Sequence, residues 1–156
     1  MRVIPRFFLV TTVIILDQWS KNLAKVYLQE YERWNLSNFI DLTLIYNKGI
    51  AFSMFDYESG MQVLPLIILT LAAISFFIFL LIKDRWSLLE EIGILFLIGG
   101  AIGNLIDRIL QGSVTDFILV YYNNFYFPAF NFADSFITIG ILLLLSMELL
   151  NKKNNN

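Results

Sequence analysis

Long apolar stretches dominate the chain, and shorter polar stretches separate them. Four of these stretches have about the 20 residues that an α-helix needs to cross a bilayer core about 30 Å thick. They cover residues 6–24, 61–82, 88–106 and 131–150. The pattern predicts four transmembrane helices, and therefore a mainly α-helical membrane protein in which residues 1–156 form a single domain.

Basic residues lie beside the spans on one side. They precede the first span, fill the link between the second and third, and follow the fourth: Arg2, Arg6, Lys83, Arg85, Lys152 and Lys153. Because cytoplasmic segments carry an excess of Lys and Arg, we expect both termini in the cytoplasm. A cleaved signal peptide would also contain an apolar stretch, but no small-x-small cleavage site follows the first span, so we expect a retained helix.

The two longer connections, on the opposite side, have the pattern of β-hairpins. Each has a β-rich run, a turn and a second β-rich run: residues 40–46, 47–49 and 50–55 in the first, and residues 114–122, 123–124 and 125–127 in the second. We expect a small extracytoplasmic β-platform from about 39–55 and 113–127. Its aromatic side chains suit the membrane interface. The platform either packs on the helix ends or grips a substrate there.

Composition narrows the chemistry further. The chain is 58% hydrophobic and 15% charged, so lipid rather than water must solvate much of it. It has no Cys and no His, which excludes thiol nucleophiles, Cys-ligated metals and Ser-His catalysis. With 11 basic and 13 acidic residues and no basic block, the composition also disfavours a basic nucleic-acid surface. Catalysis would depend on carboxylates, hydroxyls or lysines.

Polar residues gather at the outer ends of three spans. They are Asp17 and Lys21 in the first, Asn104, Asp107 and Arg108 in the third, and Asn131 and Asp134 in the fourth. Charges inside a bilayer are costly, so they tend to be functional. Taken singly, each has a structural alternative: an exposed ion pair four residues apart on a helix, an ion pair that closes a helix, or a helix cap. Their convergence on one side favours a site.

Two acids can do what His and Cys do elsewhere. A carboxyl pair that shares one proton has an ionised member, which takes a proton from water, and a protonated member, which donates to a carbonyl oxygen. Asp116 follows the third span in the outer hairpin, and Asp134 opens the fourth span. This pair predicts aspartic-peptidase chemistry, with Asn104, Arg108 and Asn131 positioning the acids and balancing their charge.

Other functions fit less well. A serine enzyme with a lysine base is disfavoured because Ser20 and Lys21 are adjacent and point apart on a helix. A small transporter would need polar groups near the midplane and internal repeats, and the spans have apolar centres. A structural membrane subunit stays open on these grounds.

Five blocks of the sequence resemble a known family, the lipoprotein signal peptidases, or signal peptidase II. In chain order they are residues 17–21 (DQWSK), 47–52 (NKGIAF), 99–108 (GGAIGNLIDR), 114–117 (VTDF) and 130–135 (FNFADS). The resemblance covers nearly the whole chain, except residues 28–38 and the Asn-rich tail. It implies four transmembrane helices, an extracytoplasmic β-platform and catalysis by the aspartates that match Asp116 and Asp134.

The resemblance also implies supporting residues and a substrate. The supporting residues that match are Asp17, Lys21, Asn47, Gly100, Asn104, Asp107, Arg108, Asn131 and Ala133. The implied reaction removes the signal peptide from a diacylglyceryl-modified prolipoprotein, just before its lipidated cysteine. The implied location is the bacterial cytoplasmic (inner) membrane, with the active site at the outer face. We expect membrane lipids as partners, a monomer, and no metal, cofactor or nucleic acid.

Overall fold

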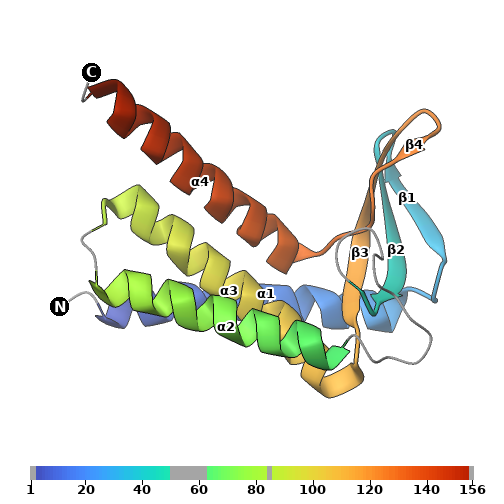
Figure 1. The fold of residues 1–156 in the computed structure, drawn as a ribbon. Coiled ribbons are helices and arrows are strands. Elements are labelled where there is room, and N and C mark those ends of the chain that lie inside the picture. The colour runs from blue at the N-terminus through green and yellow to red at the C-terminus, as the bar shows by residue number, and fades with distance from the viewer. Residues whose placement is uncertain (1–2, 50–62, 84–85, 155–156) are drawn as a thin grey trace.

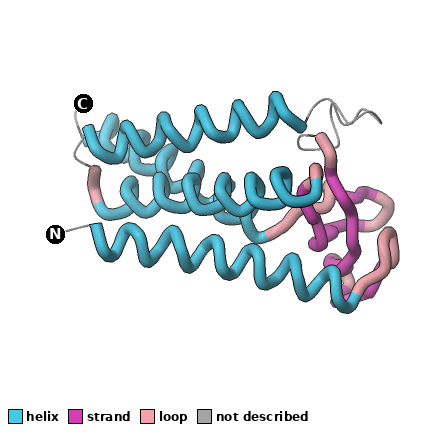
Figure 2. The backbone as a smooth tube through the Cα atoms, turned by 90° about the horizontal axis from the view of Figure 1, so that it is seen from below, coloured by secondary structure: helices cyan, strands magenta, loops and turns pink. Residues whose placement is uncertain are grey.

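The fold is a helical bundle with a small sheet at one end (Figures 1 and 2). The computed structural model describes residues 3–49, 63–83 and 86–154. The elements in chain order are α1 (Val3–Tyr27), β1 (Arg33–Ser37), β2 (Ile40–Asn47), α2 (Val63–Lys83), α3 (Leu88–Gln111), β3 (Val114–Tyr122), β4 (Phe125–Tyr126) and α4 (Phe132–Asn154). Both chain termini lie at the end opposite the sheet (Figure 1).

Among the described residues, three helices are long and apolar enough to cross a membrane. These are Val63–Lys83, Leu88–Gln111 and Phe132–Lys152. At 25 residues α1 is long enough, but its C-terminal half contains Asp17, Gln18 and Lys21, which lower its mean hydropathy. Three apolar helices and an antiparallel sheet therefore bear out part of the predicted architecture, and the fourth span stays a prediction.

The third helix extends further than predicted. The sequence pattern ended it at residue 106 because charged residues follow, whereas α3 continues to Gln111. It ends at Gly112, whose φ of 72° is left-handed and readily adopted by glycine. The extra turn stays helical because Asp107 is buried against other polar groups and needs no water. At the other end of α3, Arg6 Nε donates to Glu91 Oε1 at 2.8 Å, which joins α1 to α3.

Glycines let α3 pack closely against its neighbours and make it the central helix. A Cβ atom built on Gly100 would lie 2.5 Å from the Ala133 carbonyl oxygen in α4. One on Gly103 would lie 2.5 Å from Asp17 Oδ2 in α1. No side chain fits at such separations, so the absence of a Cβ atom allows both α1 and α4 to approach α3 closely.

The sheet differs from the predicted pair of hairpins. Its strand order is β1-β2-β3-β4, with antiparallel pairing throughout. β2 pairs with β1, which the sequence pattern missed, because Arg33–Ser37 is polar-rich and exposed at every position. The predicted partner, residues 50–55, lies outside the described residues. The second hairpin is present as β3 and β4, and Asn123 in its turn has a φ of 52°.

Candidate active site

The first turn of α4 is fixed by a reciprocal pair of hydrogen bonds. Asn131 Oδ1 accepts from the Asp134 backbone N–H at 3.0 Å, and Asp134 Oδ2 accepts from the Asn131 backbone N–H at 3.2 Å. This is a capping-box arrangement with Asn131 as the N-cap. The alternative that Asp134 is itself the helix cap therefore needs correction. Asn131 is the N-cap, and Asp134 is its partner three residues later, with Oδ1 left for another contact.

The same amide of Asn131 joins the two acids. Because Asn131 Oδ1 accepts a backbone N–H, its Nδ2 is the donor on the other side. Nδ2 donates to Asp116 Oδ1 at 2.7 Å and to Asn104 Oδ1 at 3.2 Å. Asn131 is fully buried. A single rigid amide thus contacts both Asp116 and Asp134.

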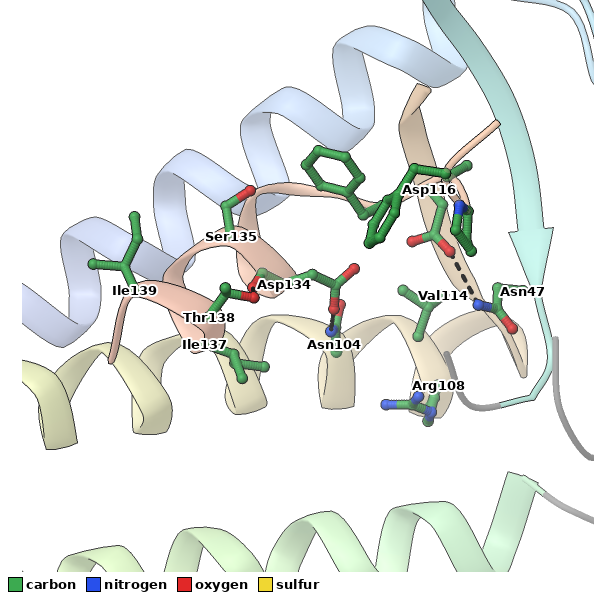
Figure 3. A pocket seen from close by; sticks show the side chains of 14 residues that line it. Asn47, Asn104, Arg108, Val114, Asp116, Asp134, Ser135, Ile137, Thr138 and Ile139 are labelled. Carbon is green, nitrogen blue, oxygen red and sulfur yellow. Dashed lines mark hydrogen bonds between the residues drawn. The ribbon is translucent and has the colours of Figure 1, made fainter. Parts of the chain in front are cut away.

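Asp116 is held from the sheet side by Asn47. Asn47 Oδ1 accepts from the Gly49 backbone N–H at 3.0 Å, so its Nδ2 donates to Asp116 Oδ2 at 3.1 Å (Figure 3). Asp116 lies in β3 beside β2 and is 3% exposed. Both of its oxygens accept an amide N–H, which fixes the plane of the carboxyl group.

Asn104 connects Asp134 to a buried cation. Its Nδ2 donates to Asp134 Oδ1 at 2.8 Å (Figure 3), and its Oδ1 accepts from Lys21 Nζ at 2.9 Å. Lys21 also pairs with Asp17 at 2.8 Å and Asp107 at 3.4 Å. All three charged side chains are at most 2% exposed, so the alternative of an exposed pair between Asp17 and Lys21 is wrong.

Two carboxylate oxygens of this ion cluster accept backbone N–H groups next to the two acids. Asp17 Oδ1 accepts from the Ala133 N–H at 2.9 Å, one residue before Asp134. Asp107 Oδ2 accepts from the Thr115 N–H at 2.9 Å, one residue before Asp116. Asp107 therefore pairs with Lys21 and the backbone of β3, rather than closing its helix through an ion pair with its neighbour in sequence.

Asp116 and Asp134 line one cavity of about 540 Å³. Their carboxyl groups both turn into it, together with Asn104 and Arg108 (Figure 3). The rest of the lining is mainly apolar and comes from Val114, residues 127–130, and Ile137 and Ile139 in α4. Arg108 Nε is buried and has no hydrogen-bond partner among the described residues. A cavity with an apolar wall, two acids and an unused cationic donor is typical of a site for an extended, partly apolar ligand.

The environment of Asp116 favours its protonated form. Burial, and after it the nearby charge of Asp134, raise the pKa of Asp116, while hydrogen bonds from Asn47 and Asn131 and the charge of Lys21 oppose the rise; together they bring this pKa to about 7. Two acids that share a site separate into an ionised and a protonated member for this reason. Near neutral pH this environment therefore favours a proton on Asp116, next to the charge of Asp134.

The structure brings nearly all of the predicted site residues into one network. Asp17, Lys21, Asn47, Asn104, Asp107, Asn131, Asp116 and Asp134 are hydrogen-bonded or ion-paired within it. Gly100 and Ala133 provide the close contact between α3 and α4, and Arg108 lines the cavity. Sequence reasoning gave no role to Gln18, Gln111 and Thr115, although Gln18 and Thr115 lie inside two of the recognised blocks.

Comparisons with known proteins point to one family. The family described as Signal peptidase (SPase) II matches residues 9–150. A lipoprotein signal peptidase of Neisseria gonorrhoeae is 40% identical over 94% of this chain and 90% of its own. One from Chromobacterium violaceum is 42% identical over 91% of this chain and 90% of its own.

Two solved structures are also similar to this chain in fold and sequence. A bacterial membrane enzyme determined in meso at 2.3 Å resolution has a TM-score of 0.89 and 29% identity, and the match covers 99% of this chain and 93% of that one. Another, at 1.9 Å, has a TM-score of 0.83 and 29% identity over 94% of each chain. With the family match spanning nearly all of the sequence, the chain belongs to the signal peptidase II family.

Proposed function

We propose that this protein is an aspartic endopeptidase that removes the signal peptide from diacylglyceryl-modified prolipoproteins, cutting just before the lipidated cysteine. The observation that carries the proposal is the bridge from Asn131 to both Asp116 and Asp134 at one cavity. Family membership supports the peptidase reaction, and the names of the relatives support the class of substrate.

We propose a placement in the bacterial cytoplasmic membrane with the cavity at the outer face. α1 serves as the fourth span, which is acceptable in lipid because Asp17 and Lys21 turn inward and are buried against α3. The two termini, at the end away from the sheet, then lie in the cytoplasm. We further propose that residues 1–156 act as a single monomeric domain in contact with membrane lipids and without a cofactor.

The proposed chemistry uses the two acids in turn. The Asp134 carboxylate takes a proton from a water molecule as the water oxygen attacks the scissile carbonyl carbon, and Asp116 donates its proton to the carbonyl oxygen. The resulting gem-diol collapses: the C–N bond breaks, Asp134 gives its proton to the leaving amine, and a diol hydroxyl returns a proton to Asp116. The dyad ends with one proton, as it began, and no covalent intermediate forms.

The assignment of roles follows from the surroundings of each acid. Asp134 lies in the first turn of α4, where the helix dipole and the Asn131 N–H favour a negative charge. Asp116 lies in a strand without such a dipole, and burial raises its pKa to about 7. We therefore assign Asp134 as the base and Asp116 as the proton donor.

Arg108 fits a role in binding the peptide. Its Nε is a buried donor with no partner among the described residues, and the side chain lines the cavity. An unsatisfied buried donor is costly, so a ligand that supplies an acceptor gains from it. We propose that Arg108 donates to a carbonyl oxygen of the bound substrate.

A direct test compares two forms of one precursor with the purified protein. The lipidated precursor should be cleaved and the unlipidated one should not, because lipid holds the scissile bond at the height of the cavity. Mass spectrometry of the product locates the cut. Equal cleavage of both forms, or a cut away from the lipidated cysteine, would contradict the proposal, as would the absence of any cleavage.

The pKa of Asp116 predicts a basic limit to activity. As pH rises above about 7, Asp116 loses the proton that it donates, so kcat should fall. Asn47→Leu removes a hydrogen bond that lowers this pKa, and the fall in kcat at the basic limb of the pH profile should therefore move to higher pH.

The folded protein also holds this proton more tightly than the unfolded chain, so the free energy of unfolding should decrease from about pH 4 to pH 7. Full pH profiles of wild type and variant measure both effects; a limb that stays in place in Asn47→Leu contradicts the assignment.

A further inference from the structure

Gln18 in α1 occupies a central position beside the ion cluster, although it does not line the cavity. Its Nε2 lies 3.0 Å from Asp107 Oδ1, 3.1 Å from the Gly103 carbonyl oxygen and 3.2 Å from Asp17 Oδ2. A carboxamide nitrogen only donates, so two hydrogens serve three acceptors. The amide therefore joins α1 to α3 and contacts both carboxylates that pair with Lys21.

The contact with Asp107 connects Gln18 to the strand that carries Asp116. Asp107 uses Oδ2 for the Thr115 N–H at 2.9 Å, and Lys21 is 3.4 Å from that same oxygen. Contacts at Oδ2 alone leave the carboxyl group of Asp107 free to rotate about its Cβ–Cγ bond. The hydrogen bond from Gln18 to Oδ1 sets this rotation, because it fixes the second oxygen of the carboxylate.

We propose that Gln18 is a positioning residue for Asp116: it orients Asp107, which in turn holds the backbone N–H of Thr115 directly before Asp116. This inference rests on the proposed function, since the role that it gives Gln18 is to position one acid of the Asp dyad. Thr115 has a second attachment, because its Oγ1 accepts from Gln111 Nε2 at 2.8 Å. The two contacts together define where β3 begins relative to α3.

The charge balance explains why an amide serves here. Asp17 and Asp107 already share a single ammonium group, that of Lys21. An amide adds donors without adding charge, whereas a glutamate of the same shape would place a third carboxylate beside them. Like charges in a buried site favour protonation, and a protonated glutamate regains one O–H donor.

Two substitutions separate positioning from a general structural role. Gln18→Met removes the donor, and kcat should fall about 10- to 100-fold with KM nearly unchanged, since misplaced reacting groups lose rate rather than binding. Near neutral pH, the kcat of Gln18→Glu should fall further than that of Gln18→Met. Its kcat relative to wild type should rise as pH is lowered toward 5, because the new carboxyl group protonates and donates to Asp107.

The matched control is Asn22→Asp, which makes the same amide-to-acid change at an exposed position one turn further along α1. It should leave kcat and its pH profile unchanged. Gln18→Glu at low pH keeps a donor and so remains informative if Gln18→Met does not fold. Wild-type kcat in Gln18→Met, or a pH-independent ratio for Gln18→Glu, would overturn the inference. The Asp116→Asn variant distinguishes the two proposals: if it is inactive while Gln18→Met is fully active, only the inference about Gln18 is lost.

Discussion

Asp116→Asn and Asp134→Asn are each expected to reduce kcat for a lipidated precursor by about 10²- to 10⁴-fold or more. Asparagine keeps the size of the side chain but cannot take a proton from water or donate an acidic one. Each acid accepts an N–H at both oxygens, so the new amide group will face one donor. That mismatch costs about 1–3 kcal/mol, which in Asp134→Asn is partly offset because a buried charge is removed, and both variants should still fold.

The matched control for these variants is Asp41→Asn. Asp41 is another buried acid of the same sheet, with 8% of its surface exposed, and accepts from Asn35 Nδ2 at 3.1 Å. It does not line the cavity, so its variant should cleave at the wild-type rate. Initial rates at saturating substrate, with size-exclusion profiles in detergent to verify folding, provide the measurement. A dyad variant with wild-type turnover would exclude that aspartate from the mechanism.

Lys21→Met should give the largest loss of stability. Lys21 is 1% exposed and balances two carboxylates, Asp17 and Asp107, which are equally buried. Its removal leaves both charges unpaired and takes a donor from Asn104 Oδ1. Breaking a buried ion pair by removing one partner costs about 3–5 kcal/mol, so a clear decrease in the midpoint of unfolding in detergent is expected.

A comparison with an exposed pair shows whether burial is the cause. Lys152 lies 3.4 Å from Glu148 in α4, and these side chains are 73% and 66% exposed. Lys152→Met should change the free energy of unfolding by less than about 1 kcal/mol. If Lys21→Met shifts the unfolding midpoint no more than Lys152→Met, then Lys21 does not have the electrostatic role described above.

Helical periodicity made much of the site predictable. Asp17 and Lys21 are four residues apart, and Asn131 and Asp134 are three apart, so each pair shares a helix face. The basic residues beside the spans predicted that these faces lie at one end of the bundle. In the structure they converge, because Asp17 accepts from the Ala133 N–H and Asn104 connects Lys21 to Asp134. Periodicity depends only on local geometry, which is why this part of the prediction agrees with the structure.

Contacts between distant segments were not predictable in the same way. β1 was missed because it is polar and exposed, so no alternating pattern marks it. Gln18 is adjacent to Asp17 in sequence, and only the packing of α1 on α3 brings it to Asp107. The direction of each Asn amide likewise depends on backbone N–H groups elsewhere, such as that of Gly49 for Asn47.

Among the residues that the structure describes, the side chains that donate hydrogen bonds to the two acids are the carboxamides of Asn47, Asn104 and Asn131. Carboxamides neither gain nor lose protons over the pH range in which proteins function. They consequently cannot buffer the cavity, and the chain has no histidine that would do so. In the proposed reaction, the mobile proton therefore passes among the dyad, the attacking water and the peptide, and none of these three amides takes part in its transfer.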